Sequence, residues 1–152
     1  SVKRRKGIFR QAKELRKKRE LKFAVSMVSA KVIDEVGINR AIKLAMTRAL
    51  RRLQLQPEEC FVKLDGGLKA PSEFTQETII KGDQKEKIIG LASICAKETR
   101  DAYMVRIAAQ PQFALYDFAT HKGYGTQRHR AAIGKRGLSE QHRRSFCSKI
   151  DT

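Results

Sequence analysis

The sequence predicts an α/β domain in which short strands alternate along the chain with longer helices. Apolar residues recur at helical spacing in three long segments, whereas three short segments have the apolar or β-branched composition of strands. The chain has 152 residues, of which 41% are hydrophobic, and this suffices for one hydrophobic core. We see neither an internal repeat nor a linker, so we expect residues 1–152 to belong to a single domain.

The first third of the chain is expected to contain two helices with one strand between them. Residues 2–20 are rich in Lys, Arg, Gln, Glu, Ala and Leu, with apolar residues at helical spacing, which predicts a very basic amphipathic helix. Residues 22–30 have the β-branched and aromatic composition of a strand. Asn39 is the expected N-cap of a helix that runs to about Leu53.

Two short strands are expected in the middle of the chain. Residues 60–64 form a short apolar strand with Asp65 at its end, and residues 77–81, Glu-Thr-Ile-Ile-Lys, form another short strand. Between them, residues 69–75 contain Pro71 and are expected to form a loop.

The remaining elements are expected to be helical. Residues 84 to about 109 carry apolar side chains at helical spacing, which predicts a long, largely buried helix, and Pro111 follows its end. Thr126 is the expected cap of a short helix that ends near Gly137.

The charge of the chain predicts a polyanionic partner. Lys and Arg number 33 against 16 Asp and Glu, so the net charge is +17. Cations attract phosphates by neutralising them and releasing their counterions, so nucleic acid is the leading partner and an anionic membrane surface is second. No apolar run approaches the length of a membrane-spanning helix.

The cysteines predict a reducing compartment. Cys60, Cys95 and Cys147 are odd in number and far apart, which argues against a disulfide framework and against a Cys-x-x-Cys zinc site. We therefore expect a cytoplasmic protein whose thiols act as small apolar side chains.

Asp65 is the acid with the most informative position. It follows a predicted strand and precedes Gly66 and Gly67. Ligands bind at the carboxyl ends of strands in α/β sheets, and glycines there let a phosphate backbone approach closely. An Asp that starts a turn produces the same pattern, and the pattern alone favours neither interpretation.

Two further acids lie near the predicted long helix. Asp101 lies within it, and a buried acid needs a cationic partner or a metal ion. Spacing favours the partner, which would be Lys97, four residues earlier. Asp83 precedes the helix and is expected to cap it.

A basic, glycine-rich loop offers a nucleic-acid contact. Tyr124 lies between two glycines, with His121 and Lys122 just upstream. Such an aromatic side chain can stack on a sugar or base while cations hold phosphates, although a turn with a packed Tyr fits equally well. His142 and Arg143 form a second basic group, which suits a phosphate contact or a solvated surface.

Taken together, five segments resemble successive blocks of bacterial ribonuclease HII in order and approximate spacing. They read Val-Lys-Leu-Asp-Gly-Gly (62–67), Ile-Lys-Gly-Asp (80–83), Ala-Ser-Ile-Cys-Ala-Lys-Glu-Thr-Arg-Asp (92–101), His-Lys-Gly-Tyr-Gly-Thr (121–126) and His-Arg-Arg-Ser-Phe (142–146). Residues 24–38 resemble a weaker upstream segment, so the likeness covers nearly the whole chain. Each block alone is weak evidence for the family, but five blocks in the same order and spacing make a specific signal.

The resemblance implies an RNase H-like fold, with a central mixed sheet flanked by helices, and an endonuclease. Its substrates would be the RNA strand of RNA–DNA hybrids and ribonucleotides embedded in duplex DNA, and two divalent ions, Mg²⁺ or Mn²⁺, would assist hydrolysis. Asp65 and Asp101 would be two of four metal-site acids, and Tyr124 would pack beside the ribonucleotide at the RNA–DNA junction. Other nucleic-acid contacts would come from Lys81, Lys97, Arg100, Lys122, His142 and Arg143.

The chain departs from the family pattern at its start. The other two acids of the family lie in an upstream Asp-Glu-Ala-Gly-Arg-Gly block, which these 152 residues do not contain. Residues 34–37, which read Asp-Glu-Val-Gly, are superficially similar to that block but lack its Arg-Gly. We therefore do not assign the role of metal-site acids to Asp34 and Glu35. We expect a truncated chain, roughly the C-terminal two thirds of the domain without its first strands, monomeric, inactive by itself and marginally folded.

One alternative belongs to another functional class. A non-catalytic nucleic-acid-binding protein would use the charge of +17 without metal chemistry. A basic ribosome-associated protein also fits the charge but leaves Asp65-Gly66-Gly67 unexplained. The genomic sequence upstream of Ser1 separates the enzyme from the binding protein, because only the enzyme requires an in-frame Asp-Glu block.

Overall fold

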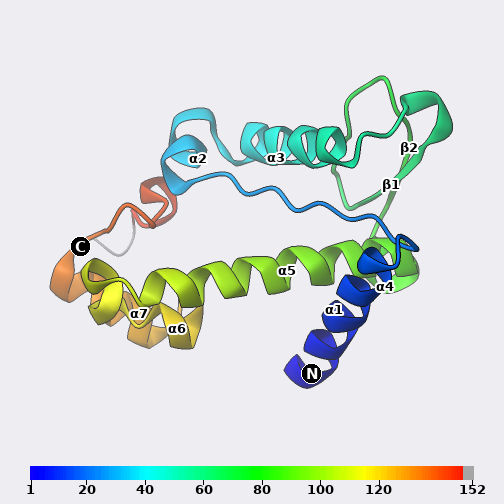
Figure 1. Cartoon of the computed structure of the whole chain (residues 1–152). Coiled ribbons are helices and arrows are strands. Elements are labelled where there is room, and N and C mark those ends of the chain that lie inside the picture. The colour runs from blue at the N-terminus through cyan, green and yellow to red at the C-terminus, as the bar shows by residue number, and fades with distance from the viewer. Residues whose placement is uncertain (149–152) are drawn as a thin grey trace. The chain divides into compact units, whose positions relative to one another are not determined.

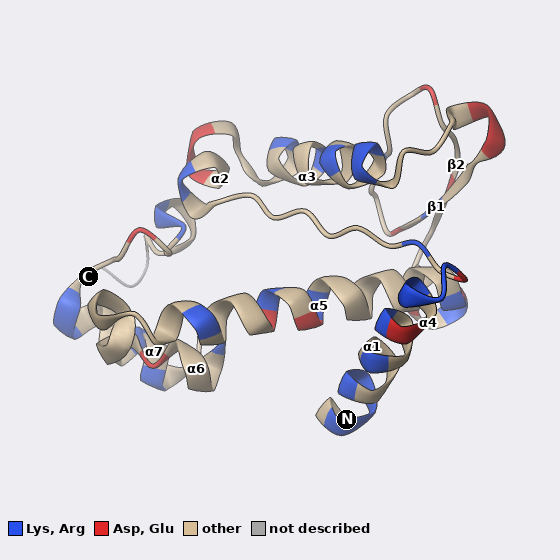
Figure 2. Cartoon of the chain, viewed as in Figure 1, with Lys and Arg blue, Asp and Glu red and all other residues tan. Residues whose placement is uncertain are grey.

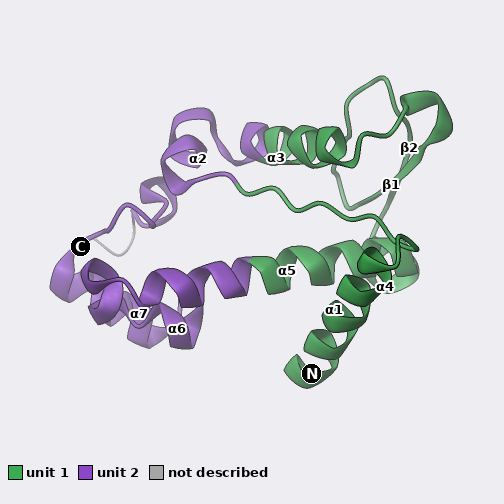
Figure 3. Ribbon diagram, in the orientation of Figure 1, with its two compact units in different colours: residues 1–27, 42–99 green, residues 28–41, 100–152 purple. Residues whose placement is uncertain are grey.

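The computed structural model describes residues 1–148, which are mostly helical with two parallel strands (Figure 1). This confirms the α/β class in its coarse form. The chain divides into two compact units (Figure 3). Unit 1 comprises residues 1–27 and 42–99, and unit 2 comprises residues 28–41 and 100–152, the last four of which lie outside the described residues.

The first helix, α1 (Val2–Lys17), confirms the expected basic segment. The Ser1 hydroxyl caps it by accepting a hydrogen bond from the Arg4 N–H at 3.4 Å. The Phe9 ring packs against Phe23, with 6.1 Å between ring centroids, and the Arg16 guanidinium lies over Phe23 at 5.0 Å. These ring contacts attach the segment after α1 back onto the helix.

The strand expected at residues 22–30 is wrong. Residues 21–29 carry no strand, and α2 (Ala30–Val36) begins at Ala30 because the Ser29 hydroxyl accepts a hydrogen bond from the Val32 N–H. The Val25 carbonyl accepts from the Arg52 guanidinium at 2.7 Å instead of from a neighbouring strand. Composition alone does not make a strand, because a strand also needs a partner for its ladder of hydrogen bonds.

The third helix, α3 (Ile38–Leu53), confirms the predicted helix but not its cap. Asn39 lies inside the first turn, whereas Gly37 supplies the junction with α2. The Gly37 N–H donates to the Ile33 carbonyl at 2.9 Å, and its own carbonyl accepts from the Ala41 N–H at 3.1 Å. Gly37 has a φ of 80°, a left-handed conformation that glycine adopts without strain.

The two strands pair in parallel and follow the short helix η1 (Pro57–Glu59). β1 (Phe61–Asp65) lies one residue after its predicted position, and β2 (Thr75–Ile79) begins two residues before residues 77–81. The Gln76 side chain of β2 bonds to the loop that precedes it: it accepts from the Ala70 N–H at 2.9 Å and donates to the Ala70 carbonyl at 3.3 Å. Asp65, at the end of β1, is the register partner of Ile79.

The long predicted helix is present but interrupted. A short α4 (Gly82–Lys85) is separated from α5 (Lys87–Ala108) by Glu86, whose backbone is extended. Asp83 lies in the first turn of α4, and the cap position belongs to Lys81, so the expected capping role of Asp83 is wrong. Apolar side chains of α5 also remain exposed, Ile88 by 56% and Val105 by 46%, so the helix is not largely buried in the structure as described.

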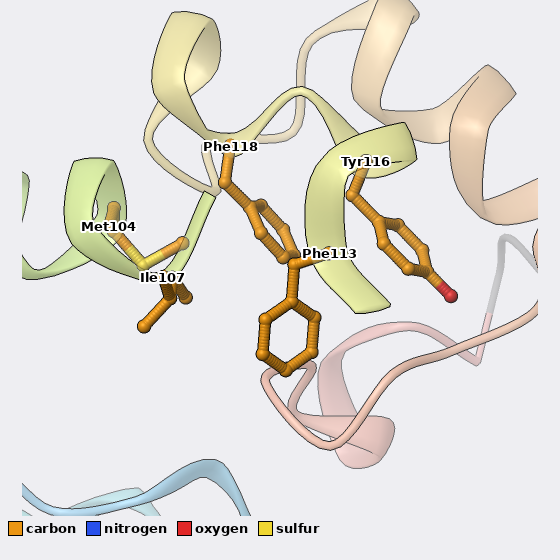
Figure 4. Close-up of a cluster of buried hydrophobic side chains, with 5 residues drawn as sticks. All are labelled: Met104, Ile107, Phe113, Tyr116 and Phe118. Atoms are coloured by element: carbon orange, nitrogen blue, oxygen red, sulfur yellow. The ribbon is translucent and has the colours of Figure 1, made fainter. Parts of the chain in front are cut away.

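The hydrophobic core of unit 2 gathers around aromatic side chains (Figure 4). It joins α5 to η2 (Pro111–Tyr116), α6 (Phe118–His121) and α7 (Gln127–Arg136). Its buried members are Met104, Ile107, Phe113, Tyr116 and Phe118. As predicted, Thr126 caps α7 by accepting from the His129 N–H at 3.2 Å, and α7 ends near Gly137, which is its C-cap.

The C-terminal part of unit 2 is attached to α2 through one carboxylate. Asp34 accepts hydrogen bonds from the Arg144 N–H at 2.7 Å and the Ser145 N–H at 3.1 Å, and also from the Ser145 hydroxyl. These contacts hold the short helix η3 (Arg144–Phe146) and lower the pKa of Asp34, chiefly through the hydroxyl hydrogen bond. The Asp34 carboxylate therefore has structural partners in η3.

Candidate functional site

Asp65 lies at the carboxyl end of β1, where the sequence predicts it. Its Oδ1 atom accepts a hydrogen bond from the Gly82 N–H at 2.7 Å, across the gap from β1 to the start of α4. The Asp65 carbonyl accepts from the Leu68 N–H at 3.3 Å, and Gly66 has a left-handed φ of 59°. The residue thus begins a turn with its backbone while its carboxylate faces the first turn of α4.

Gly82 is the neighbour that makes this geometry possible. A Cβ atom on Gly82 would lie 2.7 Å from Ile89 Cδ1 and 3.4 Å from Asp65 Oδ1. Both Gly82 and Ile89 are buried, so no open space receives a methyl group. Glycine at this position allows the main chain of α4 to approach the Asp65 carboxylate, a contact that the sequence alone does not reveal.

Gly82→Ala is expected to lower the free energy of unfolding by about 1–3 kcal/mol, because the added methyl group overpacks a filled site. The measurement is urea unfolding of the full-length gene product, meaning the whole polypeptide that the gene encoding this chain specifies. The matched control is Gly134→Ala in α7, where a Cβ meets nothing within 4 Å. That change is expected to stabilise by about 0.5–1 kcal/mol, and equal effects of both changes would contradict the packing argument.

Asp101 lies on the part of α5 that belongs to unit 2. Its side chain is 14% exposed, and the Arg100 guanidinium lies 3.6 Å from its Oδ1 atom. Arg100 Nη1 is itself buried without a hydrogen bond. An acid and a cation thus lie together on one turn of helix, where the Asp101 side chain is largely removed from water and the Arg100 side chain is 40% exposed.

The two carboxylates belong to different units, Asp65 to unit 1 and Asp101 to unit 2. Within residues 1–148, no group of three or more His, Cys, Asp or Glu side chains is arranged to hold a metal ion. Glu98 is a further buried acid of α5, which sequence reasoning missed, and it forms an ion pair with Arg5 of α1. Only its distant partner explains why this acid is tolerated in the interior.

Tyr124 is exposed by 48%, in a loop that lies against α5. The Arg100 guanidinium lies 4.9 Å from the centre of the Tyr124 ring, a cation–π contact. Lys122 and Gly123 are consecutive left-handed residues with φ of 52° and 75°. A Cβ on Gly123 would lie 3.1 Å from Met104 Cε and 3.4 Å from Arg100 Nη2, so glycine permits the close approach.

The other basic residues singled out from the sequence have different surroundings. Lys81 and Arg143 are exposed, and Lys122 donates from its ammonium group to the Ala119 carbonyl. His142 is buried, with both ring nitrogens occupied by protein groups, so the expected phosphate contact does not suit this position. The pKa of His142 is lowered to about 4, mainly by burial, which leaves the ring uncharged at neutral pH.

Positive charge extends over several elements of the chain (Figure 2). Lys and Arg occur along α1, in the last turn of α3 and at the end of α7. Acidic residues interrupt this pattern at η1, which carries Glu58 and Glu59. No helix among the described residues combines the length and the apolar character needed to cross a bilayer.

Comparison with known proteins identifies what the chain is similar to. The family model described as Ribonuclease HII matches residues 1–149. The ribonuclease HII of Caldicellulosiruptor bescii is 44% identical over 134 residues, which cover 88% of this chain and 63% of that protein. The enzyme of the same name from Endomicrobium trichonymphae is 41% identical over 139 residues, 91% of this chain and 64% of the relative.

A third relative, the ribonuclease HII of Coxiella burnetii, is 42% identical over 124 residues, or 82% of this chain and 59% of that protein. The chain thus spans about 60% of the length of the curated relatives that it matches. The matched segment of the family model includes Asp65, Asp101 and the Tyr124 loop.

Proposed function

The chain belongs to the ribonuclease HII family, and from this premise we propose that it forms part of an endonuclease for RNA–DNA duplexes. The reaction is hydrolysis of the RNA strand in hybrids and cleavage at ribonucleotides embedded in duplex DNA. The observation that carries the proposal is the family match over residues 1–149, which runs through the segments containing both candidate metal ligands. The net charge of +17 suits such a polyanionic substrate.

The proposed fold is RNase H-like, with β1 and β2 as part of a larger central mixed sheet. Support comes from apolar side chains that stay in contact with water in this chain: Phe61 of β1 is 57% exposed and Ile80, just after β2, is 73% exposed. Additional strands and helices of the family domain would cover such surfaces. The exposed apolar residues of α5 have the same explanation.

The proposed metal ligands are Asp65 and Asp101. Carboxylate oxygens suit hard ions such as Mg²⁺ and Mn²⁺, so the donor chemistry fits, although these are two of the four acids that the resemblance implies. When bound, the ions activate water and stabilise the leaving oxygen. The contribution of this chain is positional, since the Gly82 N–H holds the Asp65 carboxylate at 2.7 Å.

The proposed substrate contacts are made by an aromatic ring and by cations. Tyr124 would pack beside the ribonucleotide at the RNA–DNA junction, with Arg100 behind its ring. Phosphate contacts are assigned to the remaining basic residues of the resembling blocks, which are Lys81, Lys97, Lys122 and Arg143. We further propose a monomer in a reducing, cytoplasmic compartment, because the three cysteines of the chain are odd in number and far apart in the sequence.

The test of this function compares two polypeptides on a DNA duplex that contains one ribonucleotide. The full-length gene product is expected to cleave at the ribonucleotide when Mg²⁺ or Mn²⁺ is added. Cleavage is expected to stop when EDTA removes the ion. The 152-residue chain alone is expected to show no cleavage above background, because its sequence lacks the Asp-Glu block.

An all-DNA duplex of the same sequence is the matched substrate control. Metal-dependent cleavage by the 152-residue chain alone would refute the expected inactivity. Salt-sensitive duplex binding without cleavage by the full-length gene product would refute the endonuclease and support the non-catalytic binding protein instead.

A further inference from the structure

All three histidines of the chain are buried together in unit 2. His121, His129 and His142 are exposed by only 6%, 5% and 7%. The rings of His121 and His129 are stacked with 4.1 Å between centroids, and those of His129 and His142 lie 5.2 Å apart. The Phe118 ring contacts all three, so the cluster is enclosed by the core of this unit.

The proton position on His142 follows from its partners. The Ser139 N–H, which can only donate, lies 2.9 Å from Nδ1 of His142. That nitrogen therefore carries a lone pair, and the hydrogen of the neutral ring is on Nε2. Nε2 lies 3.0 Å from His129 Nε2, which must accept this hydrogen.

The proton position on His129 then follows in turn. With Nε2 accepting, the hydrogen of His129 is on Nδ1, which lies 2.9 Å from the Tyr124 carbonyl. A carbonyl can only accept, so each hydrogen bond in this series has a donor and an acceptor. The series runs from the Ser139 N–H through His142 and His129 to the main chain of Tyr124.

His121, whose ring is stacked on that of His129, also bonds to this loop. It accepts from the Gly123 N–H at Nδ1, at 3.1 Å, and donates from Nε2 to the Tyr116 carbonyl at 2.7 Å. Two imidazole rings thus bond to consecutive residues of the loop. The exposed ring of Tyr124 projects from this bonded main chain toward Arg100.

We propose that His129 and His142 are positioning residues that fix the Tyr124 ring for recognition of the RNA–DNA junction. The inference rests on the proposed function, because that function gives Tyr124 its role. Neither histidine touches substrate in this scheme. Each acts through the Tyr124 carbonyl, which also accepts from the Thr126 N–H at 2.7 Å.

The arrangement works only with uncharged rings. A second proton on His129 would place two N–H groups against each other, and one on His142 would face the Ser139 N–H. Burial is the first cause that lowers the pKa of both groups, and neighbouring histidines lower both pKa values further. Of the charged groups nearby, Arg100 lies over Tyr124, while Asp117 of the α6 cap pairs with Arg128 of α7 at 2.8 Å.

The first test is a double-mutant cycle on the full-length gene product, with substrates that contain either one ribonucleotide or a long RNA tract. His129→Leu is expected to reduce cleavage at the single ribonucleotide by about 10- to 100-fold, with a smaller loss on the RNA tract. In a Tyr124→Ala background, His129→Leu is expected to add almost nothing, because both changes remove the same contact. His129→Asn, which keeps a side-chain N–H near the position of Nδ1, is expected to retain most of the cleavage activity that His129→Leu loses.

The matched control is Tyr103→Phe, which removes a 2.9 Å hydrogen bond to Gln141 in the same unit without touching the loop. This variant is expected to leave the ratio of the cleavage rates on the two substrates unchanged. The inference would be overturned if His129→Leu reduced cleavage of both substrates equally, or if its effect added to that of Tyr124→Ala. Either result would mean that His129 contributes only to the stability of the fold. If the wild-type protein cleaves neither substrate, the proposed function fails.

The second test does not depend on activity. Imidazole ¹H–¹⁵N correlation spectra at pH 7 are expected to show the hydrogen on Nδ1 of His129 and on Nε2 of His142. His129→Leu is expected to shift the Tyr124 ring resonances. Opposite tautomers, or unchanged Tyr124 resonances, would overturn the inference whatever the outcome of the cleavage assays.

Discussion

Asp65→Asn and Asp101→Asn are each expected to lower the cleavage rate of the full-length gene product by about 10³-fold or more. Asn has the size of Asp and retains an oxygen that accepts the Gly82 N–H at position 65, but it lacks the negative charge that a divalent ion requires. Losing several kcal/mol of metal-based stabilisation corresponds to about three orders of magnitude in rate. The measurement is the single-turnover rate on a duplex with one ribonucleotide at saturating Mg²⁺.

The control for charge is Asp83→Asn, which alters an exposed acid in the first turn of α4. This variant is expected to cleave at nearly the wild-type rate. Circular dichroism and urea unfolding of all three variants separate a lost ligand from a lost fold. A rate within tenfold of wild type for Asp65→Asn or Asp101→Asn would remove that residue from the proposed metal site.

The second large effect is expected in the pH dependence of stability. The pKa of His142 is about 4 in the folded chain and 6.5 when the ring is in water, so the unfolded state binds more protons between these values. The free energy of unfolding is therefore expected to be highest above pH 6.5 and to fall as the pH drops toward 4. Since one pKa unit corresponds to about 1.4 kcal/mol, the decrease attributable to His142 is about 3 kcal/mol.

Urea unfolding at pH 7.5, 5.5 and 4.5 measures this effect. His142→Asn, which retains an acceptor for the Ser139 N–H, is expected to make the pH dependence between pH 6.5 and 4.5 shallower, leaving the contribution of His129, whose pKa is also lowered. Asp34 does not mask the result. Its lowered pKa contributes stability that is present above its ordinary value of 3.8 and is lost only at lower pH. The same slope in His142→Asn and wild type would contradict this account.

The features that sequence reasoning predicted correctly depend on neighbouring residues. Thr126 caps α7 through the N–H of His129, three residues later, and Gly137 is the C-cap of the same helix. Each of these features depends only on residues within one helical turn. β1 is recognisable because an apolar run ends in Asp65 and two glycines. By contrast, residues 22–30 have a strand-like composition but no strand partner, and composition carries no information about partners.

The features that were missed depend on contacts between distant residues. Gly82 is 17 positions from Asp65, and Arg100 is 24 positions from the Tyr124 ring above which it lies. His129 and His142 are separated by 13 positions, and each looks like an ordinary basic residue of an exposed segment. Only the fold shows that they are buried, neutral and bonded to each other.

The contact between Asp34 and η3 has a consequence for biosynthesis. Asp34 accepts a hydrogen bond from Ser145, 111 residues later, and unit 2 combines residues 28–41 with residues beyond 100. A ribosome must therefore translate the whole intervening segment before α2 acquires its partner. Because long-range closure is slow, unit 2 is expected to be completed late, after nearly all of this chain has been translated.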